Sequence, residues 1–173
     1  MRLPTTSRFC AALLACSVLA ACNPAYNWRD HTSQEGRYKV LFPAKPASFT
    51  RSVNLGGLRV AMTMTAADVD GATFAVGSAT APDTASAQAA LPALRAALLR
   101  NIGAAPDPMP DSAPAVDGAN VDAQGRGADG RPVRLEGRFV AHESRIYQVV
   151  VFGRPGVTPP EQVEQFLTSF TPL

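Results

Sequence analysis

Three short turn signals, each lying between segments of alternating apolar and polar residues, constrain the fold of this chain most strongly. They are Gly56-Gly57, Asp70-Gly71 and Asp129-Gly130. Glycine reaches the positive φ angles that tight two-residue hairpin turns require, so each pair is expected to join two antiparallel strands. The chain is therefore predicted to be built around an antiparallel sheet.

The segments around these turns have the alternation typical of half-buried strands. In the first half, four strands in antiparallel order are predicted over residues 37–42, 49–55, 58–65 and 73–80. In the second half, strands are predicted over residues 119–124, 133–139 and 146–152. The last of these is the most apolar, and we expect it to lie at the centre of the sheet.

Two segments change to the three- and four-residue spacing of helices. In the first, Leu91, Leu94, Leu98 and Ile102 lie in an alanine-rich stretch that follows a capping residue, which is Asp83, Thr84 or Ser86. Because proline disrupts a helix interior, either this helix begins near Leu91 or it is kinked at Pro92. Residues 104–118, rich in proline, aspartate and alanine, are predicted to form a loop.

The last helix is predicted near the end of the chain. Thr158-Pro159-Pro160-Glu161 has the pattern of a capping box with proline in the first turn. Its expected buried stripe is Val163, Phe166, Leu167 and Phe170. The fold class is therefore predicted to be α+β: an antiparallel sheet of about six to seven strands with two main helices packed on it.

Gly36-Arg37-Tyr38-Lys39-Val40-Leu41-Phe42-Pro43 with Pro46, the long hairpins, and the closing Glu161, Phe166 and Ser169-Phe170 resemble the PsbP-like fold. That fold covers extrinsic photosystem subunits and many bacterial envelope proteins. The resemblance spans residues 36–173 and implies the same α+β architecture. It implies no photosynthetic role.

The start of the chain predicts a lipoprotein signal peptide. Arg2 and Arg8 precede an apolar segment that ends in Leu19-Ala20-Ala21-Cys22, the pattern of a bacterial lipobox. Cleavage between Ala21 and Cys22 would leave Cys22 to receive a diacylglyceryl thioether. The rival Leu13-Leu14-Ala15-Cys16 is poorer, because its apolar stretch is shorter and Leu14 is bulky. The apolar segment is also shorter than the roughly 18 residues that a permanent membrane span requires.

Processing defines the expected domains: residues 1–21 as signal peptide, 22–35 as tether and 36–173 as one folded domain. Cys10 and Cys16 would be removed, which leaves Cys22 with no intrachain disulfide partner. In lipoproteins of bacteria with two membranes, the residue after the lipidated cysteine directs sorting, and Asn23 implies the outer membrane, facing the periplasm. Tyr26 and Trp28 are expected either to pack on the domain or to lie among lipid headgroups.

Charge excludes one class of partner. The chain has 16 basic and 14 acidic residues, and cleavage removes two arginines, so the mature protein is formally neutral. Nucleic-acid binding generally needs a basic face, and none is expected here. The expected partners are the membrane, through the lipid on Cys22, and a protein of the envelope.

Motifs for catalysis and metal binding are weak. His31 and His142 lie far apart, Met62 and Met64 share a strand face with core residues, and Gly77-Ser78-Ala79 lacks the pattern of a nucleophile elbow. We therefore expect no catalytic residue, no metal site and no cofactor. The expected function is a binding or assembly accessory module of the outer membrane. The alternative is a lipid-anchored hydrolase with a carboxylate site that the spacing does not identify.

One basic group is a candidate contact for an anionic ligand or an acidic partner. Arg131, Arg134 and Arg138 lie in one predicted hairpin, with Arg134 and Arg138 on the same strand face, and Arg145 begins the neighbouring strand. Paired hydrogen bonds from arginine suit carboxylates and phosphates. The alternatives are a solvated face with Glu136 between the arginines, or arginine stems packed beneath a helix.

Overall fold

The computed structural model describes residues 25–104 and 119–173, so Ala21, Cys22 and most of the predicted loop 104–118 lie outside the described residues. In chain order the elements are β1 (Arg29–Ser33), β2 (Tyr38–Phe42), β3 (Ala47–Leu55), β4 (Leu58–Val69), β5 (Ala72–Thr80), α1 (Thr84–Asn101), β6 (Ala119–Arg126), β7 (Pro132–His142), β8 (Arg145–Gly153), α2 (Pro160–Ser169) and β9 (Thr171–Pro172).

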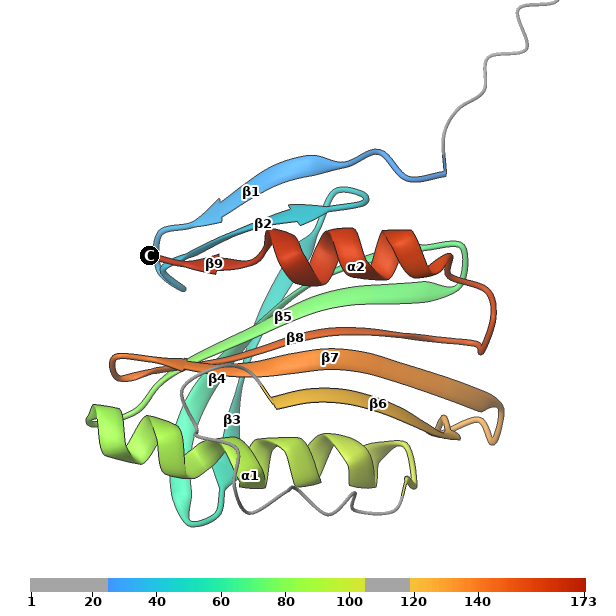
Figure 1. Cartoon of the computed structure of the whole chain (residues 1–173). Helices are drawn as coiled ribbons and strands as arrows, with labels where there is room; N and C mark the ends of the chain where they lie inside the picture. Colours follow the sequence, from blue (N-terminus) through green and yellow to red (C-terminus); the bar gives the residue numbers. More distant parts are fainter. Residues whose placement is uncertain (1–24, 105–118) are drawn as a thin grey trace, which may run out of the picture.

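A six-stranded antiparallel sheet in the order β3-β4-β5-β8-β7-β6 forms the centre of the molecule (Figure 1). This arrangement confirms the predicted α+β class. Gly56, Gly57, Gly71 and Gly130 all have positive φ at the predicted turns. As expected, the apolar strand β8 lies inside the sheet, where it pairs with β5 and β7.

The two ends of the chain form a second sheet that the sequence analysis did not anticipate. Strand β2, expected beside the other early strands, instead pairs with β1 and with the short β9 in a three-stranded sheet. Tyr38 of β2 lies opposite Pro172 of β9. Alternation identifies β2 as a strand but says nothing of its partner, and β9 is too short to show any periodicity.

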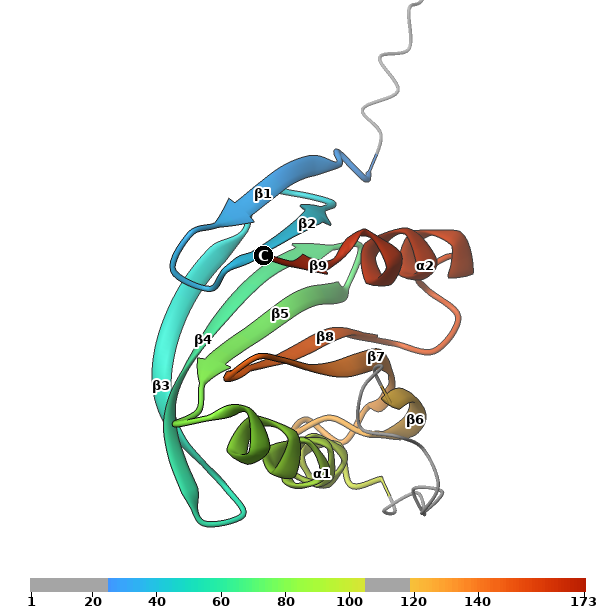
Figure 2. The same ribbon diagram turned by 60° about the vertical axis from the view of Figure 1, so that its left-hand side comes forward.

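The two faces of the six-stranded sheet are covered by different elements. Helix α1 packs on one face, while α2 and the β1-β2-β9 sheet pack on the other (Figures 1 and 2). Each face therefore has its own hydrophobic cluster. In the described parts of the chain, neither helix has the length and apolar character needed to cross a bilayer.

Helix α1 begins at the earlier of its two predicted starts. The Asp83 side chain caps it, with Oδ1 accepting a hydrogen bond from the backbone N–H of Ser86 at 2.7 Å. Pro92 lies inside the helix, so a start near Leu91 is wrong.

The predicted capping box of α2 is also wrong. Pro159 is the N-cap and makes no side-chain hydrogen bond. The helix begins one residue later than predicted, so Thr158 lies outside the capping position and the proline ring offers no acceptor.

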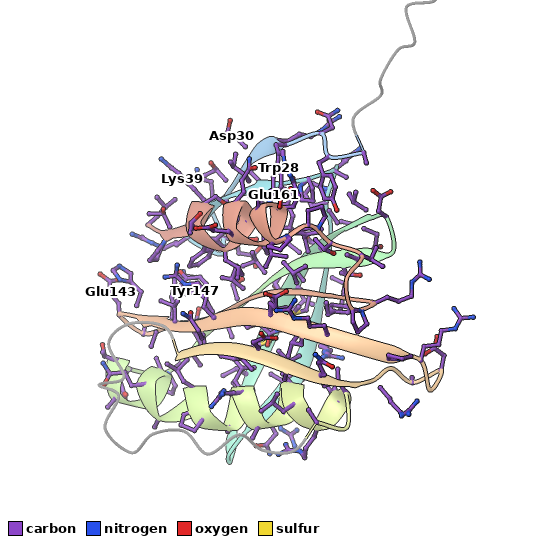
Figure 3. All side chains as sticks on the ribbon, turned by 45° about the vertical axis from the view of Figure 1, so that its right-hand side comes forward. Trp28, Asp30, Lys39, Glu143, Tyr147 and Glu161 are labelled. Atoms are coloured by element: carbon purple, nitrogen blue, oxygen red, sulfur yellow. The ribbon has the colours of Figure 1, made fainter. Side chains whose placement is uncertain are left out.

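The segment predicted as a tether, residues 22–35, contains part of the folded domain, because β1 lies within it. Tyr26 and Trp28 pack against Phe74, with ring centroids 6.1 Å apart in each case. The Trp28 indole Nε1–H also donates to Gln162 Oε1 of α2 at 3.1 Å, and Figure 3 shows Trp28 beside that helix. Of the two alternatives for these aromatic residues, packing on the domain is confirmed.

Candidate functional site

The three arginines singled out in the sequence lie along the β6–β7 hairpin but do not converge. Arg134 and Arg138 of β7 are on the same face, as expected, and α2 covers that face. Arg131 lies at the hairpin turn with most of its side chain exposed. The face therefore lies beneath a helix rather than in open solvent.

Each of these arginines already has a partner. Arg134 forms a two-point hydrogen bond with the carboxylate of Asp122, at 3.0 and 2.9 Å, and lies 3.3 Å from Glu136. These hydrogen bonds from Arg134 lower the pKa of Asp122. Arg138 Nη1 donates to the Leu167 carbonyl at 3.3 Å, and Arg131 is 3.5 Å from Asp129. Carboxylates thus offset the charge of Arg134 and Arg131, whereas the partner of Arg138 is a backbone carbonyl.

The histidines and methionines occupy structural positions. His31 contacts the rings of Tyr38 and Phe42, and His142 is exposed in the β7–β8 turn. Met62 is buried in the cluster beneath α1. Across residues 25–104 and 119–173, no three His, Cys, Asp or Glu side chains come together in a way that could hold a metal ion.

A polar cavity lies elsewhere, on the α2 side of the six-stranded sheet and beside the β1–β2 turn. It has a volume of about 240 Å³. Its floor is formed by strands β3, β4 and β5, and its wall by the turn that joins β1 to β2. Hydroxyl-bearing side chains dominate the lining, and they are Ser33, Thr50, Thr63, Ser78 and Thr80. We call this cavity the hydroxyl pocket.

Strand register explains why the hydroxyls gather. Thr50 of β3 lies opposite Thr63 of β4, and Thr63 lies opposite Ser78 of β5. Directly opposed residues in antiparallel strands point to the same face, so the three hydroxyls form one row across the sheet. The Thr50 and Thr63 Oγ1 atoms are 2.7 Å apart and hydrogen-bonded.

Among the described residues that line the hydroxyl pocket, Arg145 is the one cation. It begins β8 opposite Thr80, and its Nη1 donates to the Glu35 backbone carbonyl at 2.9 Å. This bond ties the guanidinium to the wall of the pocket. Among the described residues, no carboxylate lies within ion-pair distance of Arg145, in contrast to Arg134.

Tyr147, next to Ser78 on the sheet, secures the wall of the hydroxyl pocket. Its hydroxyl lies 2.9 Å from the carbonyl oxygens of both Gly36 and Arg37. Figure 3 shows Tyr147 between the six-stranded sheet and the layer that contains α2. Burial raises the pKa of Tyr147, so its hydroxyl stays neutral at ordinary pH. A Cβ on Gly36 would come within 2.6 Å of the Tyr38 ring, so this turn requires glycine.

The side chains that line the hydroxyl pocket are better suited to binding a ligand than to catalysing a reaction. Hydroxyls both donate and accept hydrogen bonds, and a guanidinium donates to carboxylate or phosphate oxygens. A serine or threonine hydroxyl becomes a nucleophile only beside a general base. Of the described residues that line the pocket, none is a histidine, lysine or cysteine, and Glu35 is the one carboxylate. No hydrogen bond is formed between the Glu35 carboxylate and a hydroxyl of the described lining residues.

Arg145 belongs to the basic group predicted from the sequence, whereas the hydroxyls of the pocket were not predicted. A signal for them was present: Ser48, Thr50 and Ser52 alternate along one segment, and Thr63 and Thr65 alternate along its hairpin partner. Two paired strands whose hydroxyl-bearing residues lie opposite each other predict a polar face of the sheet. The wall could not be anticipated, because Arg145 and Glu35 lie 110 residues apart.

No family model matches this chain, and no curated protein matches it.

Proposed function

We propose that this chain is a lipoprotein, anchored through Cys22 in the outer membrane and facing the periplasm, whose folded domain binds a small ligand and is not an enzyme. The lipobox sequence supports the anchor. Packed residues begin only a few positions after Cys22, at Tyr26, so the domain would lie close to the membrane surface. The resemblance to the PsbP-like fold is part of the same proposal and is supported by the α+β architecture.

The observation that carries the binding function is the hydroxyl pocket with Arg145 at its side. Its volume of about 240 Å³ is below the roughly 300–1,000 Å³ usual for drug-sized ligands, so the ligand is small. The Arg145 guanidinium, which pairs with no carboxylate among the described residues, suits an anionic group of a ligand. The row of hydroxyls suits a ligand that itself carries several hydroxyl groups. The ligand class that combines both is an acidic monosaccharide.

The described carboxyl groups with a shifted pKa are not suited to acid catalysis. Acid catalysis by a carboxyl group at neutral pH generally requires a raised pKa. The two described carboxyl groups with a shifted pKa, Asp83 and Asp122, are both shifted downward by hydrogen bonds. Neither lines the hydroxyl pocket.

Calorimetric titration of the mature protein with D-glucuronate and with D-glucose tests the binding proposal. We expect glucuronate to bind more tightly, and Arg145→Gln to weaken it by roughly tenfold, as expected for loss of a charged hydrogen bond. Thr63→Val should weaken both sugars, while Arg131→Gln, at an exposed arginine outside the pocket, should change neither. Failure of the wild-type protein to bind either sugar contradicts the proposal.

Lipidation is tested separately. Cys22→Ser should abolish incorporation of radiolabelled palmitate, because a hydroxyl is a much weaker nucleophile than a thiolate. Equal labelling of wild type and variant would contradict the anchor without bearing on the pocket.

A further inference from the structure

Strand β3 is an open edge of the six-stranded sheet. It is the first strand in the sheet order and, among the described strands, pairs only with β4 (Figure 2). Seven of its nine residues are exposed, and Val53 is half-buried. Phe49, at mid-strand, is 56% exposed. This combination of a long strand and an exposed aromatic ring is unusual at an edge, where natural proteins avoid uncontrolled pairing.

The register shows which backbone groups of β3 face outward. A two-residue turn makes its flanking pair, Leu55 and Leu58, a hydrogen-bonded pair, and such pairs alternate along an antiparallel ladder. The even-numbered residues, Ser48, Thr50, Ser52 and Asn54, therefore direct their N–H and C=O groups away from β4. These groups form a template for one more strand.

Arg51 is the one charged residue of β3, and most of the other devices that usually protect an edge are missing from this strand. Its sequence contains no proline and no lysine, and its pairing with β4 is continuous from Ala47 to Leu55 without a bulge. At the opposite edge, the Arg126 N–H of β6 donates to the Ile102 carbonyl at the end of α1, at 2.6 Å. One edge is thus partly occupied by the end of α1, whereas no described segment pairs with the outer side of β3 over its nine residues.

We propose that a second copy of this chain pairs its β3 antiparallel to this edge, with Thr50 opposite Thr50 of the second copy. A two-fold axis normal to the sheet lets the outward-facing even-numbered residues pair with each other. In this register Phe49 lies opposite Arg51 of the second copy, twice, which allows a cation–π contact. Moving one strand by two residues would place Arg51 opposite Arg51, and like charges directly opposite are unfavourable.

The same axis is compatible with the proposed lipid anchor, on which this step rests. A rotation about the sheet normal keeps each face on its own side. Tyr26 and Trp28 pack on the α2 side of the sheet, so both chains would approach one membrane from the same side. The pairing also joins the rows of Thr50, Thr63 and Ser78 from the two copies, which makes the two hydroxyl pockets neighbours.

Disulfide cross-linking of the mature lipidated protein in intact cells tests the register. In Thr50→Cys the two Cα atoms would lie about 5.5 Å apart, within the range of a disulfide. In Ser52→Cys they would lie about 14 Å apart, because four residues separate them along the strand. We expect Thr50→Cys to form a linked homodimer on a non-reducing gel and Ser52→Cys alone to form none. Ser52→Cys co-expressed with Ser48→Cys should cross-link.

The wild-type protein separates failure of the anchor from failure of the dimer. If Cys22 carries lipid, it has no thiol and wild type does not cross-link. A dimer linked through Cys22 in wild type would overturn the anchor alone. Cross-linking of Thr50→Cys to a different protein, or of Ser52→Cys to itself, would overturn the proposed pairing.

Introducing a lysine into β3 tests the same pairing in detergent solution without added cysteines. Thr50→Lys would place two like charges directly opposite each other, whereas Ser52→Lys, the matched control, would face Ser48 of the second copy. Sedimentation should show dimers for wild type and Ser52→Lys and monomers for Thr50→Lys. The two variants should have the same melting temperature by circular dichroism, which shows that each domain is folded. A monomeric wild type, or a dimeric Thr50→Lys, would overturn the proposal.

Discussion

One face of the six-stranded sheet is covered by a single helix, and the other is covered by both ends of the chain. On the α1 face, small residues allow close packing: Ala87 and Ala90 of the helix are buried against the sheet. At Gly125 of β6 the approach is closest, because an added Cβ would collide with the Ile102 carbonyl oxygen. The close packing of α1 on this face thus depends on residues with small side chains or none.

The opposite face depends on aromatic rings. Phe166 of α2 packs against Phe42 and Phe74, with centroids 5.5 and 5.4 Å away. The chain ends hold each other there: the Leu41 N–H donates to Ser169 Oγ at 3.0 Å, and the Leu173 N–H donates to the Arg37 carbonyl at 2.9 Å. The α1 face should therefore be the more sensitive of the two to added volume, while the loss of a buried ring should destabilise either face.

The largest expected effect comes from removing one phenylalanine from either face. Phe166→Ala on the aromatic face and Phe139→Ala on the α1 face should each lower the free energy of unfolding by about 3–5 kcal/mol, since both rings are fully buried. Chemical denaturation measures this loss. The single tryptophan, Trp28, distinguishes the faces, because it contacts Phe74, which in turn contacts Phe166.

Only Phe166→Ala should shift the native-state emission of Trp28 to longer wavelength. Phe139→Ala is its matched control, with the same chemistry on the far side of the sheet. Equal emission shifts in both variants would mean that the two clusters are one cooperative core, and the comparison of faces would fail.

A smaller effect is expected from adding one methyl group on the α1 face. Gly125→Ala should lower the free energy of unfolding by about 1–3 kcal/mol, because the end of α1 must move away from β6. Gln124→Ala, at the exposed neighbouring residue, is the control. A melting temperature for Gly125→Ala equal to that of the control would show that α1 does not pack as closely as described.

Local patterns predicted what lies close in sequence. The turns at Gly56-Gly57 and Asp70-Gly71, and the faces of β4, β5 and β7, followed from alternation and from glycine. The β1-β2-β9 sheet did not, because it joins residues such as Lys39 and Thr171 that are far apart along the chain. The cap of α2 was misplaced because Pro159 and Pro160 both fit a first turn, and only the backbone shows which begins the helix.

The same distinction applies to the hydroxyl pocket. Its floor is formed largely by one hairpin, whose alternating Ser and Thr residues are visible in the sequence. Its wall, in contrast, is held by hydrogen bonds from Tyr147 and Arg145 to carbonyls of residues 35–37. The prediction that the arginines of the β6–β7 hairpin contact an anion was incomplete for the same reason. The spacing placed Arg134 and Arg138 on one face but did not reveal that Asp122 and Leu167 would engage them.

The smallest expected effect is a pH dependence confined to the aromatic face. His31 of β1 lies with its ring centroid 5.4 Å from that of Phe42, and burial lowers its pKa. As pH falls below about 6.5, the unfolded chain binds a proton at His31 before the folded chain does, so the free energy of unfolding decreases. The stability that neutral His31 contributes is thus present above that pH and lost below it.

Urea denaturation between pH 7 and pH 5, followed by Trp28 emission, measures this dependence. The His31→Gln variant should lose part of the decrease, because it has no group to titrate at that position. His142→Gln, which changes the exposed histidine at the end of β7, is the matched substitution. If His31→Gln and wild type lose stability in parallel over this range, β1 does not hold His31 against the aromatic cluster in the folded protein. The aromatic face would then be no more sensitive to mild acid than the α1 face.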